Sequence, residues 1–150
     1  YCELQKLRFR ERFTYSVEIS EGTDLQRQLP KMTIQTFVEN SVKHGIENSK
    51  EGGTVGVRVG LLNGALLIVV SDNGVGRDAA AASGKKGFGQ GIRTIERIFE
   101  FMNRFNREKA GFEIHDLSDP SGNAVGTEIR IVIPESYRFD IPESKEVKEK

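Results

Sequence analysis

The chain contains one uninterrupted apolar run, Leu66 to Val70, that gives way within two residues to the polar sequence Asp72-Asn73-Gly74-Val75-Gly76. Because the run does not alternate apolar with polar positions, it predicts a central strand that is covered on both faces. Burying a carboxylate at the end of such a strand is costly unless a polar group donates a hydrogen bond to it. The glycines would let another molecule approach the backbone, although Asp-Asn-Gly is also a common turn sequence. We therefore expect either a binding site or an ordinary turn here.

The composition narrows the class of protein. Lys and Arg number 22 and Asp and Glu number 22 in 150 residues, so no global positive field is available to hold a nucleic acid or an anionic membrane. No apolar run reaches the roughly 18 residues that a membrane-spanning helix needs. The single Cys2 cannot form an internal disulfide, and neither it nor His44 and His115 has the spacing of a metal site. We expect one domain in a cytoplasmic setting.

Hydrophobic periodicity predicts an alternation of strands and helices. Apolar residues at every second position predict further strands over residues 13–19, 55–59, 112–115 and 127–133. A stripe spaced by four predicts a helix from residue 31 that ends at Gly45, and a second stripe predicts a helix over 92–105. Four glycines between positions 84 and 91 indicate that residues 77–91 form a mobile lid ahead of the second helix.

The first of these helices has a second, polar face. Asn40, Lys43 and His44 are spaced by three or four residues, so an amide, an ammonium and an imidazole point the same way. An amide oxygen suits a hard cation such as Mg²⁺, which takes few protein ligands. An ammonium on the same face can neutralise the phosphates that bring the metal. The face therefore predicts that Asn40 is a metal ligand, with an ordinary surface amide as the alternative.

Two other segments have chemistry that complements this face. Asp72 can accept a hydrogen bond from an exocyclic amine, which selects adenine over guanine. The backbone N–H groups of Gly87, Gly89 and Gly91, together with the positive end of the helix that follows, can cradle an anionic tail. The three segments together predict a site for an adenine nucleotide, which is a far more specific signal than any of them alone.

At this point the chain resembles a known family. Residues 37–45, Phe-Val-Glu-Asn-Ser-Val-Lys-His-Gly, resemble the N-box of the GHKL ATP-binding fold. Residues 72–76 and 87–92 resemble its two glycine boxes, and residues 126–129, Gly-Thr-Glu-Ile, resemble its later Gly-Thr strand. With Leu29-Pro30, Gln35 and Val38-Glu39-Asn40, the chain is most similar to the catalytic domains of LytS-like sensor histidine kinases. The match covers roughly residues 1–134.

The resemblance implies an α+β fold of the GHKL (Bergerat) type, a two-layer α/β sandwich with a mixed sheet and helices on one face. Residues 13–134 would form the ATP-binding catalytic domain, and residues 135–150 a charged C-terminal tail. Residues 1–12 would be the trailing end of a dimerisation or phosphoacceptor helix, or a lead-in. The implied reaction is transfer of the γ-phosphoryl group of ATP to a histidine on a separate helical domain or subunit. A response regulator would then receive the phosphate, in a full-length kinase that is a homodimer anchored in the membrane.

The family's pattern also implies roles for single residues. At the phosphate end, Asn40 would hold Mg²⁺ and Lys43 would meet phosphate. His44 would lie beside the base or the phosphates, and Glu39, next to the metal ligand, would orient the incoming nucleophile. At the base end, Asp72 would contact adenine with the help of a water near Gly76 and Thr127, and Gly74 also belongs to the nucleotide-binding residues.

One departure from the pattern bears on the reaction. Thr36 stands four residues before Asn40, where the ATP-hydrolysing branch of the fold has a glutamate that activates water. A threonine hydroxyl cannot serve as a base near neutral pH, so hydrolysis should be slow. This favours a kinase over a GHL-type ATPase. The phosphoacceptor helix itself is not in the chain, so a module that binds nucleotide without transferring phosphate is the main alternative.

Overall fold

The structure is a computed structural model that describes residues 1–47, 49–76 and 89–141. Its main elements are α1 (Cys2–Phe9), β1 (Phe13–Ile19), α2 (Thr33–Asn40), β2 (Gly53–Leu62), β3 (Ala65–Asp72), α4 (Gln90–Met102), β4 (Gly111–Ser118) and β5 (Ala124–Ile133). A short 3₁₀ helix, Arg10–Arg12, follows α1, and a π-helix, Ser41–Ile46, continues α2. No helix in the described ranges is both long and apolar enough to cross a bilayer.

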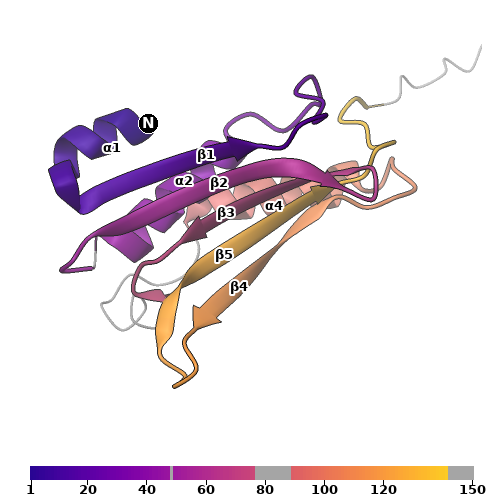
Figure 1. Cartoon of the computed structure of the whole chain (residues 1–150). Helices are drawn as coiled ribbons and strands as arrows, with labels where there is room; N and C mark the ends of the chain where they lie inside the picture. The colour runs from indigo at the N-terminus through magenta and orange to yellow at the C-terminus, as the bar shows by residue number, and fades with distance from the viewer. Residues whose placement is uncertain (48, 77–88, 142–150) are drawn as a thin grey trace, which may run out of the picture.

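The strands of the described part form one mixed sheet in the order β1-β2-β3-β5-β4. β1 and β2 are parallel and are connected through α2, whereas all other neighbours are antiparallel. The tight β2–β3 connection is Asn63-Gly64, with φ of 51° and 82°, as expected of a two-residue hairpin. Helices α2 and α4 lie together on one face of the sheet (Figure 1). The α+β sandwich with helices on one face is therefore confirmed.

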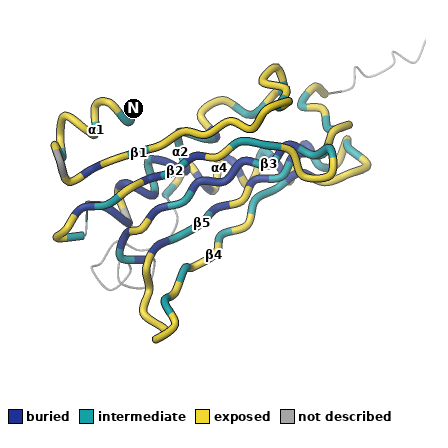
Figure 2. Tube along the Cα trace, viewed as in Figure 1, coloured by how far each residue is buried: buried dark blue, intermediate teal, exposed yellow. Residues whose placement is uncertain are grey.

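The central strand is the predicted apolar run. β3 lies in the middle of the sheet, and its side chains Leu66, Ile68 and Val70 are 3%, 1% and 0% exposed beneath the helices. Figure 2 shows this strand as mainly buried between more exposed neighbours. On the open face, Val69 is still only 7% exposed, although helices of the described part lie on the other side. Val69 lies in register between Arg58 and Arg130, and both arginines pair with Glu128. These long charged side chains cover Val69 on the face of the sheet that the helices do not cover.

The other predicted strands also form. β1 has the predicted bounds, and Ile129, Ile131 and Ile133 of β5 point into the core with 3%, 0% and 2% exposure. β4 is longer than predicted, because it runs to Ser118 and pairs with β5 along its whole length. The predicted strands over 112–115 and 127–133 left a longer gap than the observed connection, which spans only residues 119–123.

The predicted helices differ at their ends. The helix over 31–45 begins at Thr33 and changes to π-helical geometry at Ser41, with a hydrogen bond of 2.9 Å from Glu47 N–H to Val42 O. The prediction that Gly45 ends this helix is wrong, because the helix continues to Ile46. In α4 the buried stripe ends at Met102, and Phe105, which the pattern placed in the stripe, is 45% exposed beyond the helix end.

The two ends of the described chain behave differently. None of the residues of α1 is fully buried, and Arg8 pairs with Glu47 at 2.9 Å. After β5, Tyr137 and Phe139 pack against the core, and the Tyr137 hydroxyl donates to Asn103 Oδ1 at 2.8 Å. The charged segment 143–150 and most of the predicted lid, 77–88, lie outside the described residues.

Candidate functional site

Asp72 is a buried carboxylate at the end of the central strand. It is 5% exposed, and its Oδ1 accepts a hydrogen bond of 3.0 Å from the Gly74 N–H. Burial raises the pKa of the Asp72 carboxyl, whereas the Gly74 N–H, the nearby Ser41 hydroxyl and the backbone of Thr127 oppose this by favouring its charged form. Thr127 is the register partner of Asp72 on β5. Because a carboxylate offers about four acceptor positions, Asp72 can still receive a hydrogen bond from a ligand amine.

Two glycines bring the helix against this strand end. A Cβ on Gly74 would lie 2.2 Å from Gly45 Cα, and a Cβ on Gly45 would lie 2.7 Å from Asp72 Oδ1. The Val75 N–H donates to Gly45 O at 3.4 Å across the same contact. The sequence predicted that Gly74 lets another molecule approach the backbone and that Gly45 ends a helix. In the structure Gly74 makes room for the backbone of Gly45, and Gly45 makes room for the carboxylate of Asp72, so the π-helix lies directly beside Asp72.

Ser41 is a residue of this site to which sequence reasoning gave no role. It is 4% exposed and lies beside Asp72, yet its hydroxyl oxygen makes no hydrogen bond of good geometry within the described part of the chain. An unsatisfied buried hydroxyl costs about 1–3 kcal/mol. A nucleobase edge, which presents donors and acceptors side by side, would satisfy it together with Asp72. The sequence feature that could have pointed to Ser41 is its position as a small polar residue next to the buried apolar stripe that includes Val38 and Val42.

Asn40 lies at the other end of the same helical segment. Its Nδ2 donates to Thr36 O at 2.7 Å, and its Oδ1 lies 3.4 Å from the place of a Cβ on Gly89. A Cβ on Gly91 would lie 2.7 Å from Thr36 Cγ2, so the first turn of α4 packs directly on α2. The amide oxygen of Asn40 therefore faces the N-terminus of α4, where unpaired backbone N–H groups favour negative charge.

The remaining predicted residues lie around this segment. Glu39 precedes Asn40 and accepts a hydrogen bond of 2.7 Å from Gln35 Nε2. Lys43 is exposed on the π-helix, which also contains His44. The side chain of His44 and the whole of Gly87 are not among the described parts of the chain, so these two predictions stay as they were made.

Two further glycines shape the base end. Gly76 has a φ of +76°, and a Cβ there would lie 2.8 Å from Ala124 Cβ. Gly126, next to Thr127, has a φ of +144°, and a Cβ there would lie 1.9 Å from Asp72 O. Both positions require glycine because left-handed or otherwise unusual backbone and a close neighbour coincide. Thr127 is thus held against Asp72 by a backbone contact that no larger residue at 126 would allow.

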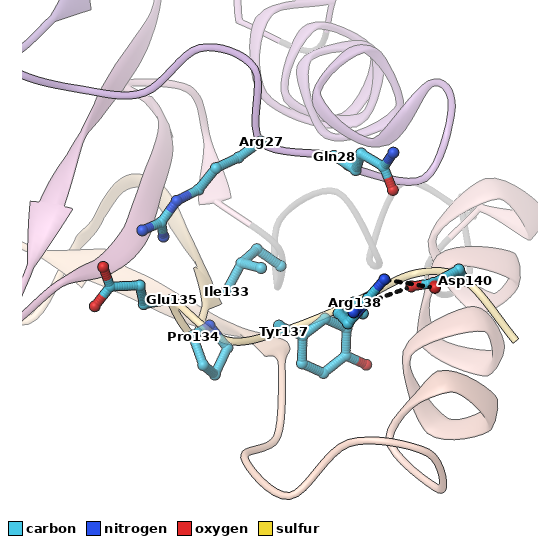
Figure 3. Close-up of a pocket in the computed structure, with 8 residues that line it drawn as sticks. All are labelled: Arg27, Gln28, Ile133, Pro134, Glu135, Tyr137, Arg138 and Asp140. Atoms are coloured by element: carbon cyan, nitrogen blue, oxygen red, sulfur yellow. Dashed lines mark hydrogen bonds and ion pairs between the residues drawn. The ribbon is translucent and has the colours of Figure 1, made fainter. Parts of the chain in front are cut away.

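The described cavity in Figure 3 does not belong to this site. Its volume is about 390 Å³, and it includes Ile133, which pairs with Leu66 at the end of β3 opposite Asp72. Leu66 and Asp72 are six positions apart on β3, a distance of about 20 Å along the strand. Three of its charged side chains already have partners, since Arg138 pairs with Asp140 within the lining at 3.0 Å and Arg27 donates to Gly64 O at 2.9 Å.

The residues present fit an adenine nucleotide with Mg²⁺. Asp72 and the unsatisfied Ser41 hydroxyl offer an acceptor and a hydroxyl for a base, and the Asn40 oxygen faces the start of α4 as a hard-cation ligand would. Within the described ranges, His, Cys, Asp and Glu side chains nowhere gather in a group of three that could hold a metal. Mg²⁺ commonly takes one or two protein ligands together with phosphates, a role that the Asn40 oxygen would suit.

The chain is similar in sequence to sensor proteins of bacteria. It is 28% identical over 137 residues to the sensor protein LytS of Staphylococcus saprophyticus, an alignment that covers 86% of this chain and 22% of the relative. It is 32% identical over 85 residues to the sensor histidine kinase BtsS of Escherichia coli K12, covering 56% and 15%. The chain thus spans about a fifth or less of the length of these curated relatives. No model of a protein family matches the sequence.

Solved structures show the same fold. The catalytic domain of histidine kinase ThkA superposes with a TM-score of 0.56 and 14% identity, covering 89% of this chain and 87% of that one. Full-length ShkA in complex with AMPPNP superposes with a TM-score of 0.56 and 19% identity, covering 89% and 28%. The chain thus has the fold of these histidine kinase catalytic domains, and its sequence is similar to segments of the sensor protein LytS and the sensor histidine kinase BtsS.

Proposed function

We propose that this chain binds ATP with Mg²⁺ and transfers the γ-phosphoryl group to a histidine on a separate helical domain or subunit. The observation that carries the proposal is that one helical segment, α2 with its π-helical extension, contributes to both ends of the site. It presents Asn40 to the start of α4 and places Ser41 and Gly45 against Asp72. A nucleotide that spans these two ends would have its base at Asp72 and its phosphates at Asn40.

The side chains divide the work between the ends. Asp72 accepts a hydrogen bond from the adenine amine, with Ser41 and the backbone of Thr127 beside it, while Gly74 and Gly76 shape the turn. Lys43 and His44 lie near the phosphates, and the N–H groups of Gly87, Gly89 and Gly91 cradle them. Asn40 holds Mg²⁺, which when bound neutralises phosphate charge. In this transfer the bond from the γ-phosphorus to its bridging oxygen breaks, a bond to an imidazole nitrogen forms, and ADP leaves.

The proposal extends to the partners. Glu39, fixed by Gln35, orients the imidazole that receives the phosphoryl group. The catalytic domain works within a homodimeric kinase that is anchored in the membrane and keeps this domain in the cytoplasm. The phosphate then passes to the aspartate of a response regulator. The solved complex of histidine kinase ThkA with the response regulator protein TrrA supports this kind of partner.

Calorimetry tests the base end of the site. We expect ATP to bind and GTP to bind at least about tenfold more weakly, because the guanine carbonyl would face the Asp72 carboxylate. Omitting Mg²⁺ should weaken ATP binding, since the phosphate charges then lack their counter-ion. Equal affinity for ATP and GTP would contradict the adenine assignment, and undetectable binding of both would contradict the proposed function.

Replacing Asp72 by Asn sharpens the test. Asp72→Asn should lower ATP affinity about 10- to 100-fold, because the amide can present a donor to the adenine amine. In the unchanged chain ATP affinity should fall as the pH is lowered toward the raised pKa of Asp72, and the variant should lose this dependence. Asp24→Asn, at an exposed position in the connection between β1 and α2, is the matched control.

The raised pKa also fixes the sign of a stability effect. The folded state binds the Asp72 proton more tightly than the unfolded state, whose carboxyl titrates near 3.8. Stability from this group is therefore present below pH 3.8 and is lost as the pH rises through the folded value. Consequently, the loss of ATP affinity in Asp72→Asn should not be accompanied by a loss of folded structure at neutral pH, which circular dichroism checks.

A further inference from the structure

Within the described residues, helices α2 and α4 leave the β1 edge of the sheet uncovered. A helix is about 10 Å wide and strands are about 4.8 Å apart, so α2 and α4 cover about four strands. The row of side chains that runs across the sheet to β1 shows where the cover ends. Ile68 on β3 is 1% exposed, Val59 on β2 is partly buried, and Ile19 on β1 is 52% exposed. Val17, two residues earlier on β1, is 58% exposed.

These side chains form the floor of a groove of about 540 Å³ between β1 and α2. Ile34 and Val38 of α2 line one wall, and Leu25, which is 63% exposed, lies on the connection between β1 and α2. The groove is largely apolar, but it is too open to enclose a small ligand, since ligand pockets usually bury most of their ligand. An amphipathic helix laid beside α2 would cover the exposed aliphatic groups and complete the layer.

One wall of the groove adjoins the part of α2 that precedes Asn40. Gln35, which lines it, holds Glu39 through its 2.7 Å hydrogen bond, and Glu39 directly precedes Asn40. This end of the groove is also negative. Tyr1 lines it, and burial together with the charges of Glu39 and Glu47 raises the pKa of Tyr1 to about 12. Carboxylates at this end suit a helix that presents an imidazole, whose N–H donates to them and whose positive form they stabilise.

We propose that this groove, defined by Val17, Ile19, Leu25, Ile34 and Val38, is the docking site of the phosphoacceptor helix. The helix lies along α2 and brings its histidine past Glu39 to the phosphates at Asn40. The inference rests on the proposed function and adds to it the surface that the acceptor uses. The continuity between the groove and the Gln35–Glu39 pair distinguishes this occupant from an unrelated protein.

The test uses the complete kinase with Ile19→Glu, which places a charge on the groove floor. Phosphorylation of the histidine should fall at least tenfold, because the apolar face of the helix would meet a carboxylate. ATP affinity, measured by calorimetry, should stay within twofold, which shows that the domain is folded. Leu62→Glu is the matched control, because Leu62 is an aliphatic strand residue of similar exposure, 50%, whose alternation on β2 points it to the opposite face.

A photo-crosslinking side chain at Val17 gives a second readout that does not depend on catalysis. The expected product joins the groove to the phosphoacceptor helix. Undiminished phosphorylation in Ile19→Glu, or a crosslink to a second catalytic domain instead, would overturn the proposal. If the unchanged kinase binds ATP but phosphorylates no histidine, the proposed function fails, whereas the crosslink still decides what occupies the groove.

Discussion

Asn40→Ala in the complete kinase is expected to lower histidine phosphorylation at least about 100-fold while changing the affinity for Mg²⁺-free ATP only about twofold. The physical reason is that the Asn40 oxygen is the proposed metal ligand, and it faces the start of α4 where the phosphates would lie. Its other amide atom is already engaged with Thr36 O. Removing the amide therefore removes a contact to the metal and leaves the base end intact. Phosphorylation assays and calorimetry with and without Mg²⁺ check the two halves of this expectation.

Two further variants separate the role of the oxygen from that of the nitrogen. Asn40→Asp keeps an oxygen for Mg²⁺ but loses the donation to Thr36 O, and it should retain part of the Mg²⁺-dependent affinity. Asn123→Ala, which removes an exposed amide from the β4–β5 loop, should have no effect. If Asn40→Ala transferred phosphate at the rate of the unchanged kinase, the metal ligand would have to be another residue.

Local sequence patterns were sufficient for the sheet and for the choice of segments. The bounds of β1 and the central place of β3 follow from alternation and from an unbroken apolar run, both of which are short-range signals. The hairpin at Asn63-Gly64 follows from turn chemistry that two residues dictate. The site segments were found because their residue types recur at fixed spacings within each segment.

Contacts between segments that are distant in the sequence could not be predicted from such local patterns. The role of Gly45 depends on Gly74, 29 positions later in the sequence, and a lone glycine near a helix end is more often a cap. The change to π-helical geometry at Ser41 has no periodic signal, because its apolar residues still recur at spacings compatible with an α-helix. Ser41 was missed for the same reason, since only the packed structure shows that its hydroxyl is buried beside Asp72.

The contact between Gly45 and Gly74 leads to the second large effect, that Gly74→Ala should lower the free energy of unfolding by about 3 kcal/mol or more. The added methyl would lie 2.2 Å from Gly45 Cα and 2.5 Å from the carbonyl carbon, and backbone atoms cannot move aside as a flexible side chain can. Thermal and urea denaturation measure the loss. Gly111→Ala is the matched control, because a Cβ there has nothing within 4 Å, and it should be neutral or slightly stabilising.

The same substitution tests how the site is assembled. To admit the methyl, the π-helix and the end of β3 must move apart, which would separate Ser41 from Asp72 while leaving Asn40 beside α4. The affinity for ATP should therefore fall more than the affinity for inorganic phosphate or for Mg²⁺ alone. The substitution changes the distance between the two ends of the site but leaves the binding groups at each end in place. If Gly74→Ala had the same free energy of unfolding and the same ATP affinity as the unchanged protein, the backbones of Gly45 and Gly74 could not be in contact. The inference that one helical segment spans both ends of the nucleotide would then lose its support.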